Sequence, residues 1–185
     1  MIGIIDYNMG NLASVYNACK LIDADATIVK NPEDLKKFNR VILPGVGAYK
    51  DAMEHLIQTG MNEAVYEFAK TGKPMIGICL GMQLLFESSQ EFGHSDGLGL
   101  IDGHVIKFDK SKMHEDFKIP HMGWNTIKNK ENPLFEGLKD PYLYFVHSYH
   151  AVTSEKNTIG TTTYGYDFVS AVNKANIYGL QPHPE

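Results

Sequence analysis

The first half of the chain alternates short apolar runs with helix-like segments, and this alternation restricts the possible folds more than any other feature. The four apolar runs are Met1–Asp6, Thr27–Val29, Val41–Leu43 and Met75–Ile78. Such alternation is typical of a parallel sheet with helices on its faces. Met75–Ile78 is apolar on both faces, which indicates a central strand.

The segments between these runs carry helix start and stop signals. Asn11 can cap a helix that continues to about Ile22, because apolar residues recur there at helical spacing. Asn31 begins a second helix, with a proline and two acidic residues in its first turn. A long helical stretch over 48–71 is expected to break at Gly60. A further helix is expected after Cys79, through about Ser89.

From Gly103 onward the pattern changes to short alternating runs that predict antiparallel strands added to the parallel core. The expected strands are Val105–Phe108, Trp124–Ile127, Tyr142–Val146, Thr158–Tyr164, Phe168–Asn173 and Ile177–Leu180. The predicted fold class is therefore α/β, with a mixed, mostly parallel central sheet flanked by helices. The sequence has neither repeats nor a linker, so we expect residues 1–185 to form one domain.

Composition argues against several classes of function. The net charge is −5 and there is no run of Lys or Arg, so we expect binding neither to nucleic acid nor to an anionic membrane. No apolar stretch approaches the ~20 residues needed to cross a bilayer. The two cysteines, Cys19 and Cys79, do not form the pattern of a disulfide scaffold. We expect a cytoplasmic protein whose partner is a small molecule or another protein.

The segment Gly77-Ile78-Cys79-Leu80-Gly81 lies where an apolar strand meets a helix. It is the thiol counterpart of the nucleophile elbow, in which a sharp turn projects the nucleophile above the sheet. The positive end of the following helix favours negative charge on the sulfur. The alternative is an inert core cysteine, which is the commoner role of a buried thiol.

The last five residues, Gln181-Pro182-His183-Pro184-Glu185, supply what a thiol nucleophile needs. A nucleophile requires a base, and the base requires an orienting group. Residues two apart in an extended segment point the same way, so Glu185 can hold the imidazole of His183 toward the sulfur. The alternative is a surface segment with an incidental histidine.

The turn Pro44-Gly45-Val46-Gly47 follows another predicted strand and opens on the same sheet edge as Cys79. Its glycines allow amides to turn inward. An N–H of Gly45 or Val46, together with that of Leu80, could then form an oxyanion hole. An ordinary strand-to-helix turn is the alternative.

Together these elements resemble the class I, or triad, glutamine amidotransferases, and within them the glutaminase subunits of imidazole glycerol phosphate synthases. The resemblance covers essentially the whole chain. Its motifs are the opening IGIIDYNMGNLASV, the turn LPGVGAY, the elbow GICLGMQLLFE, and the later segments PHMGWN, YFVHSY and HPE. The triad spacing is shared by the wider class, whereas DYNMGN, PHMGWN and FVHSY point to the histidine-pathway subunits.

The resemblance implies a role for individual residues. Cys79 would be the nucleophile, His183 the general acid and base, and Glu185 the residue that orients it. The positions implied around bound L-glutamine are Gly45, Gly47, Gln83, Glu91, His147, Ser148 and Tyr149. The positions implied at the partner, a synthase subunit with a (β/α)₈ barrel that completes a heterodimer, are Asn11, Trp124 and Tyr144. From the residues alone, Trp124 and Tyr144 could equally be core aromatics. No cofactor is implied.

His147 and His150 could be mistaken for a metal pair, but no acidic or thiol cluster accompanies them, so we interpret them as hydrogen-bonded or solvated histidines. The chain departs from its relatives at Pro182, where an aromatic residue is usual. Relatives also continue beyond the final glutamate, and we expect a tail after Glu185.

Three other functions remain open from the sequence. The glutaminase could feed a paralogous synthase that amidinates a sugar. The chain could be a catalytically silent regulatory subunit, which the complete triad argues against. It could also be a redox-sensing thiol protein, in which the pairing of His183 with Glu185 would have no purpose.

Overall fold

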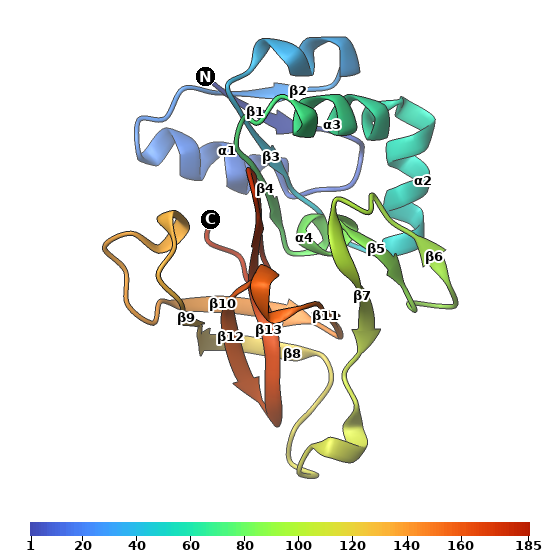
Figure 1. Cartoon of the computed structure of the whole chain (residues 1–185), viewed down its shortest axis with the longest axis vertical. Coiled ribbons are helices and arrows are strands. Elements are labelled where there is room, and N and C mark those ends of the chain that lie inside the picture. Colours follow the sequence, from blue (N-terminus) through green and yellow to red (C-terminus); the bar gives the residue numbers. More distant parts are fainter.

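The computed structural model describes residues 1–185 as a mixed α/β structure (Figure 1). The helices are α1 (Leu12–Leu21), α2 (Tyr49–Thr59), α3 (Met61–Lys70) and α4 (Leu80–Leu84), with 3-10 turns η1 (Pro32–Lys37), η2 (Lys110–Lys112), η3 (Pro133–Phe135) and η4 (Glu155–Asn157). The strands of the first half are β1 (Ile2–Ile5), β2 (Ala26–Val29), β3 (Arg40–Leu43), β4 (Met75–Ile78), β5 (Phe86–Ser89) and β6 (Ser95–Asp96). Those of the second half are β7 (Ile101–Lys107), β8 (His121–Thr126), β9 (Lys128–Asn129), β10 (Tyr142–His147), β11 (Tyr149–Val152), β12 (Thr158–Tyr164), β13 (Tyr166–Lys174) and β14 (Ile177–Leu180).

The principal sheet has the strand order β2-β1-β3-β4-β14-β13-β11-β7-β5-β6. Its first five strands are parallel, with β4 in the middle between β3 and β14. The predicted parallel core, and the central position of Met75–Ile78, are therefore confirmed. The carboxyl ends of these strands share one edge, which is where open α/β sheets bind ligands.

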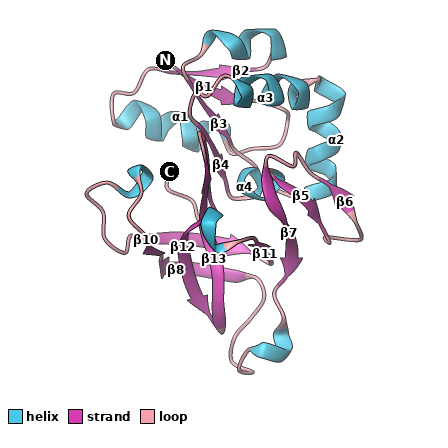
Figure 2. Cartoon of the chain, in the orientation of Figure 1, coloured by secondary structure: helices cyan, strands magenta, loops and turns pink.

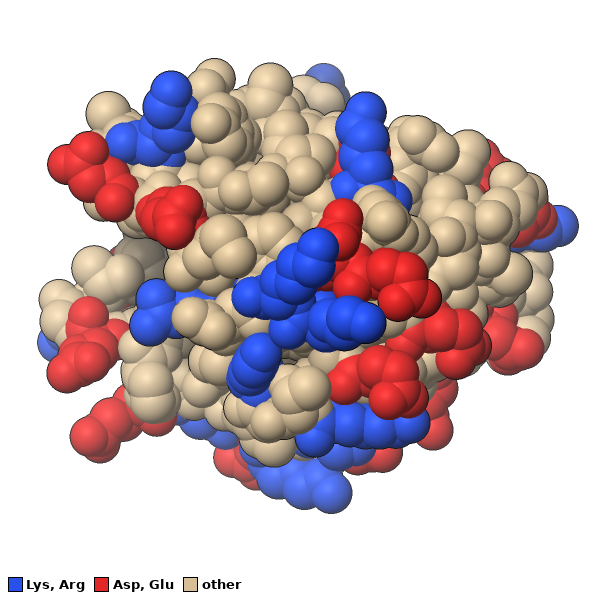
Figure 3. Space-filling model, turned by 90° about the horizontal axis from the view of Figure 1, so that it is seen from above, with Lys and Arg blue, Asp and Glu red and all other residues tan.

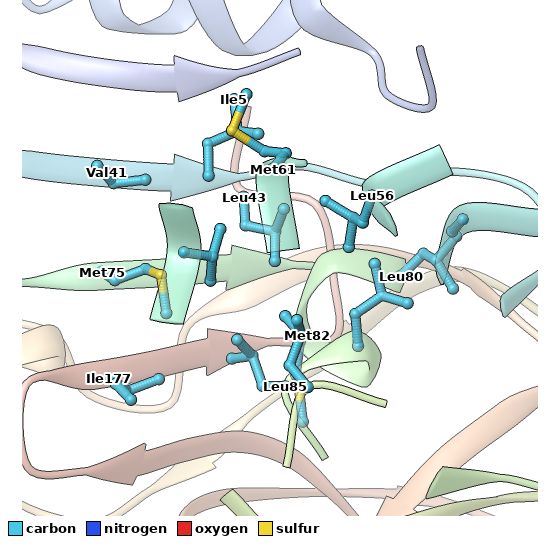
Figure 4. Close-up of a cluster of buried hydrophobic side chains, with 14 of the residues drawn as sticks. Ile5, Val41, Leu43, Leu56, Met61, Met75, Leu80, Met82, Leu85 and Ile177 are labelled. Carbon is cyan, nitrogen blue, oxygen red and sulfur yellow. The ribbon is translucent and has the colours of Figure 1, made fainter. Parts of the chain in front are cut away.

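Side chains alternate across the parallel strands, so each face receives its own cover. Ile5 and Leu43 point toward α2, α3 and α4 and belong to a core of 26 buried residues. Figure 4 shows part of this core, with Leu56 and Met82 against the sheet. Ile4 points the other way, toward buried residues of α1. Figure 2 shows α1 and the pair α2 and α3 on different sides of the strands.

Helix signals were interpreted correctly except at two places. Asn11 caps α1 by accepting a hydrogen bond from the Ser14 N–H, and Gly60, at φ +72°, separates α2 from α3 as predicted. The helix expected at Asn31 is only the 3-10 turn η1. The helix expected from Cys79 to Ser89 was wrong in length, because α4 ends at Leu84 and Phe86–Ser89 becomes strand β5, paired in parallel with β7.

The second half contains the expected strands, arranged differently in two respects. The runs around Trp124 and Tyr142 do not join the main sheet, because β8 and β10 pair with one another as a separate antiparallel sheet. The last strand, β14, is antiparallel to β13 but parallel to β4, so it links the two halves. A second core of nine buried residues fills the space between β8, β10 and the main sheet.

None of the helices is both long and apolar enough to span a membrane. On the face drawn in Figure 3, basic and acidic side chains lie beside one another rather than in separate fields. This distribution agrees with the absence of a basic run in the sequence.

Candidate active site

Cys79 occupies a strained turn between β4 and α4. Its backbone has φ +54° and ψ −114°, a conformation that non-glycine residues rarely adopt and that is often found at functional sites. A β-carbon added to Gly77 would lie 2.5 Å from the Gly81 carbonyl oxygen, and one on Gly81 would lie 1.9 Å from the Leu43 carbonyl oxygen. The elbow therefore needs glycine at both positions, and it carries the thiol to the wall of a cavity.

His183 and Glu185 lie together beside this elbow, in the extended segment after β14. The Nδ1 atom of His183 is 2.8 Å from Oε1 of Glu185. The backbone N–H of His183 donates to the Tyr144 carbonyl oxygen of β10 at 2.9 Å. Pro182 lacks an N–H, but the amide of Gln181 donates to Ser170 on β13, so both neighbours of the proline are held.

The protonated form of His183 is strongly favoured. Hydrogen bonding to the Cys79 side chain and then to Glu185 raises the pKa of His183 to about 10, although burial works in the opposite direction. Burial alone would raise the pKa of Glu185, but its hydrogen bond from His183 keeps that pKa below its usual value. The arrangement is that of an imidazolium held between the side chain of Cys79 and the carboxylate of Glu185.

The turn after β3 presents backbone amides near the sulfur. The N–H groups of Gly45, Val46 and Gly47 donate no hydrogen bond within the chain. Gly47 has φ +95°, which favours glycine there. Together with the N–H of Leu80 at the start of α4, these amides are available to an oxyanion formed above Cys79.

One cavity of about 600 Å³ collects most of the residues predicted to bind substrate. The predicted residues that line it are Val46, Gly47, Cys79, Leu80, Gln83, Glu91, His147, Ser148, Tyr149 and His183. Gly45 and Glu185 are not among the residues that line this cavity, and Glu185 contacts His183 instead. Glu91 is fixed in place because its carboxylate accepts a hydrogen bond of 2.7 Å from the first N–H of α2.

Gln83 is buried, and both hydrogens of its amide are already used. They are donated to the Tyr149 carbonyl oxygen at 3.1 Å and to Oε1 of Gln181 at 2.9 Å. Only the side-chain oxygen of Gln83 is therefore free to meet a ligand. Gln181, which is fully buried, was not singled out from the sequence, where only its position two residues before His183 could have indicated it.

Lys107 was also missed by sequence reasoning. It lies at the end of β7, opposite Tyr149 of β11, and it lines the same cavity as Glu91. The sequence signal was weak, since a lysine in an alternating strand is usually a solvated residue. With Glu91 it gives the cavity one carboxylate and one ammonium group.

The three buried histidines are hydrogen bonded, as expected for His147 and His150. The Tyr149 carbonyl oxygen accepts from Nδ1 of His147, so Nε2 of His147 accepts in turn from Nδ1 of His121 at 3.1 Å. His150 bonds the Tyr166 hydroxyl and the Ala151 carbonyl. Burial lowers the pKa of His121 to about 4 and that of His147 to about 3.

The residues implied at a partner surface lie outside the cavity. Trp124 is 60% exposed, which excludes a core role for it, and its ring stacks on that of Tyr142 at 5.8 Å. Tyr144 is half-buried, with its ring 6.0 Å from that of Trp124. Asn11 is exposed at the start of α1. The outer side of the β8–β10 sheet is therefore aromatic and accessible.

Comparison with known proteins agrees with this geometry. Residues 3–185 match the family model described as glutamine amidotransferase class-I. The chain is 61% identical to the imidazole glycerol phosphate synthase subunit HisH of Sulfurimonas denitrificans, over 100% of this chain and 90% of the relative. It is 58% identical to the subunit of the same name from Wolinella succinogenes, over 100% of this chain and 92% of the relative.

Solved structures show the same fold at low sequence identity. A crystal structure of a glutamine amidotransferase superposes with a TM-score of 0.77 at 16% identity, over 99% of this chain and 89% of that one. The structure of PurLQS from Thermotoga maritima superposes with a TM-score of 0.74 at 20% identity, over 99% of this chain and 86% of that one.

Proposed function

The chain belongs to the class I glutamine amidotransferases, with HisH subunits of imidazole glycerol phosphate synthase among its relatives, and from this membership we propose that it is the glutaminase subunit of such a synthase. It hydrolyses L-glutamine to glutamate and ammonia and supplies the ammonia to a synthase subunit in histidine biosynthesis. One observation carries the proposal: Cys79 in a strained elbow at a cavity that also holds His183, itself bonded to Glu185.

The reaction proceeds through a thioester. The Cys79 thiolate attacks the carboxamide carbon of glutamine, and the carbonyl oxygen becomes an oxyanion held by backbone N–H groups of Val46 and Leu80. His183, held as an imidazolium by its two partners, gives its proton to the departing ammonia. It then takes a proton from water, which attacks the thioester, releases glutamate and returns Cys79.

The cavity suits the zwitterionic end of an α-amino acid. Glu91 supplies a fixed carboxylate for the α-ammonium group, and Lys107 supplies a cation for the α-carboxylate. The free side-chain oxygen of Gln83 accepts a further N–H from the substrate. Ser148 and Tyr149 line the cavity close to Lys107 and complete the pocket.

The exposed aromatic side of the β8–β10 sheet is where the synthase subunit binds in our proposal. Trp124 and Tyr142 are large, exposed and stacked, as is typical of residues that anchor protein interfaces. Tyr144 of the same sheet accepts the backbone hydrogen bond of His183. The partner is a (β/α)₈-barrel subunit that forms a heterodimer with this chain, and Asn11 contributes to the contact. Two free cysteines fit a cytoplasmic location.

Free glutaminase activity would waste glutamine, so the isolated chain is expected to be nearly idle. The Gly45–Gly47 turn provides a means of control, because its amides have no partner within the chain and glycine rotates at little cost. Glutamate release is to be measured with and without the synthase and its acceptor. Equal rates in both assays would rule this regulation out.

Reconstitution with the synthase tests the function itself. The pair should make product from either ammonia or glutamine, and Cys79→Ala should remove only the glutamine-dependent rate. Cys19→Ala, the other buried free cysteine, is the matched control and should keep both. Glutamine-dependent synthesis that survives Cys79→Ala contradicts the proposal. Transfer of ammonia only to a different synthase, such as one that amidinates a sugar, would reassign the acceptor.

A further inference from the structure

Tyr7 lies two residues after the end of β1 and is buried at the base of the Gly45–Gly47 turn. Its hydroxyl donates a hydrogen bond of 2.9 Å to the carbonyl oxygen of Pro44. Pro44 is the first residue of the turn, so this bond fixes the peptide group that joins Pro44 to Gly45. The contact joins two segments 37 residues apart in the sequence, and nothing in the motifs predicted it.

The hydroxyl, the turn and the elbow meet with almost no free space. A β-carbon on Gly45 would lie 2.8 Å from the Tyr7 hydroxyl oxygen and 2.7 Å from the Gly81 amide nitrogen. The same β-carbon would lie 3.0 Å from Cβ of Leu80, whose N–H is one of the two proposed oxyanion donors. The turn therefore cannot shift as a body toward the elbow, and its freedom is limited to rotation of individual peptides.

The Tyr7 hydroxyl is suited to hold the Pro44 carbonyl in one position. A phenol carries one proton, and in this structure that proton goes to the Pro44 carbonyl. Burial, and to a lesser degree the charge of Cys79, raise the pKa of Tyr7 well above its ordinary value. The group therefore remains a protonated donor wherever the enzyme works.

We propose that Tyr7 is a positioning residue for the oxyanion donors: its hydroxyl holds the Pro44 carbonyl and thereby directs the N–H of the following Gly45–Val46 peptide toward the oxygen that becomes charged above Cys79. This inference rests on the proposed glutaminase function. Tyr7 therefore acts only where an oxyanion forms at the substrate carbonyl, and reactions of Cys79 that form no oxyanion do not depend on it.

Tyr7→Phe removes only the hydroxyl oxygen and tests the proposal directly. In the complex with the synthase and its acceptor, the kcat for glutamine hydrolysis should fall about 10- to 100-fold, because a misdirected donor loses much of its effect. The KM should change less than about 3-fold, since the residues that bind the zwitterion are untouched. Alkylation of Cys79 by iodoacetamide should keep its rate, because displacement at a saturated carbon forms no oxyanion.

Tyr66→Phe is the matched control. Tyr66 lies on α3, is partly buried against the core of 26 residues and does not line the cavity. Loss of the Tyr66 hydroxyl should leave both hydrolysis and alkylation as in the unmodified chain. Tyr7→Met, which also lacks the donor, provides a second variant should Tyr7→Phe unfold; thermal melting identifies that case.

The outcomes separate the inference from the function on which it rests. Unchanged glutamine hydrolysis in Tyr7→Phe overturns the inference, and so does an equal loss of hydrolysis and alkylation, which would place the effect on the sulfur. Either result leaves the glutaminase function standing so long as Cys79→Ala abolishes hydrolysis. Hydrolysis that survives Cys79→Ala would instead refute the function.

Discussion

The Nε2 atom of Gln181 lies 3.9 Å from the Sγ atom of Cys79, within reach of a weak hydrogen bond to sulfur. The backbone segments that carry these two side chains are also hydrogen bonded, because the Cys79 N–H donates to the Leu180 carbonyl oxygen at 2.8 Å. Gln181 also accepts from Gln83 through its side-chain oxygen. One buried amide thus orients the sulfur and a residue of the substrate cavity at once.

Gln181→Met should therefore impair catalysis without unfolding the chain. Methionine keeps the length of the side chain but removes the donor to the sulfur and the acceptor for Gln83, so kcat should fall about 10-fold. Steady-state glutamine hydrolysis by the complex measures the effect. Gln58→Met, on the exposed side of α2, is the control and should be silent. Equal activity of the two variants would show that the Gln181 amide has no role.

Glu185→Gln is expected to lower kcat by about 100- to 1000-fold, because glutamine cannot hold an imidazolium in the required orientation as a carboxylate does. It should also bring the pKa of His183 below about 10, and Cys79→Ala should lower that pKa further, since Cys79 is the larger cause of the shift. NMR titration of the His183 ring measures both. Glu54→Gln, exposed on α2, should change neither quantity.

The pKa of His183 also determines how its contacts change the stability of the fold with pH. The His183 pKa is raised from 6.5 to about 10, so its contacts stabilise the fold fully below pH 6.5 and lose their effect as the pH rises through 10. A His183→Ala variant, compared with the unmodified chain by urea unfolding, should therefore differ most near pH 6, and the difference should shrink as the pH rises toward 10. A difference that grows above pH 10 would contradict the assignment of an imidazolium.

The elements that could be predicted from the sequence are those with strong local signals. Asn11 and Gly60 define helix ends through their own backbone and side-chain chemistry, and the structure has both where expected. The helix predicted through Ser89 failed because Phe86–Ser89 pairs with β7, a contact that local periodicity cannot show. The separate β8–β10 sheet was missed for the same reason.

The residues of the site likewise separate into those that the sequence could indicate and those that it could not. The elbow at Cys79 and the His183–Glu185 pair depend on spacing along the chain, so the sequence could indicate them. Tyr7 and Gln181 act through long-range contacts to Pro44 and Cys79, which exist only in the folded molecule. Their roles could not be predicted because a buried tyrosine or glutamine carries no motif of its own.

The buried histidine pair predicts a loss of stability in acid. His121 and His147 have pKa values lowered to about 4 and about 3, so below pH 6.5 the unfolded chain binds protons that the folded chain does not. Stability should fall by roughly 1 kcal/mol per pH unit for each histidine between pH 6 and about pH 4. Urea unfolding at several pH values measures this slope. His121→Phe should make it shallower, and His104→Phe, at an exposed position, should not.

Lys107→Met should raise the KM for glutamine about 10-fold or more with little change in kcat, because the lost cation contacts the α-carboxylate equally in the ground state and the transition state. Glutaminamide, which lacks the negative charge, distinguishes this from a general effect: its KM should be nearly the same for Lys107→Met and for the unmodified chain. Lys20→Met, on the exposed side of α1, controls for net charge. A KM that rises equally for both substrates would remove Lys107 from carboxylate recognition and leave Ser148 and Tyr149 to provide it through their backbone.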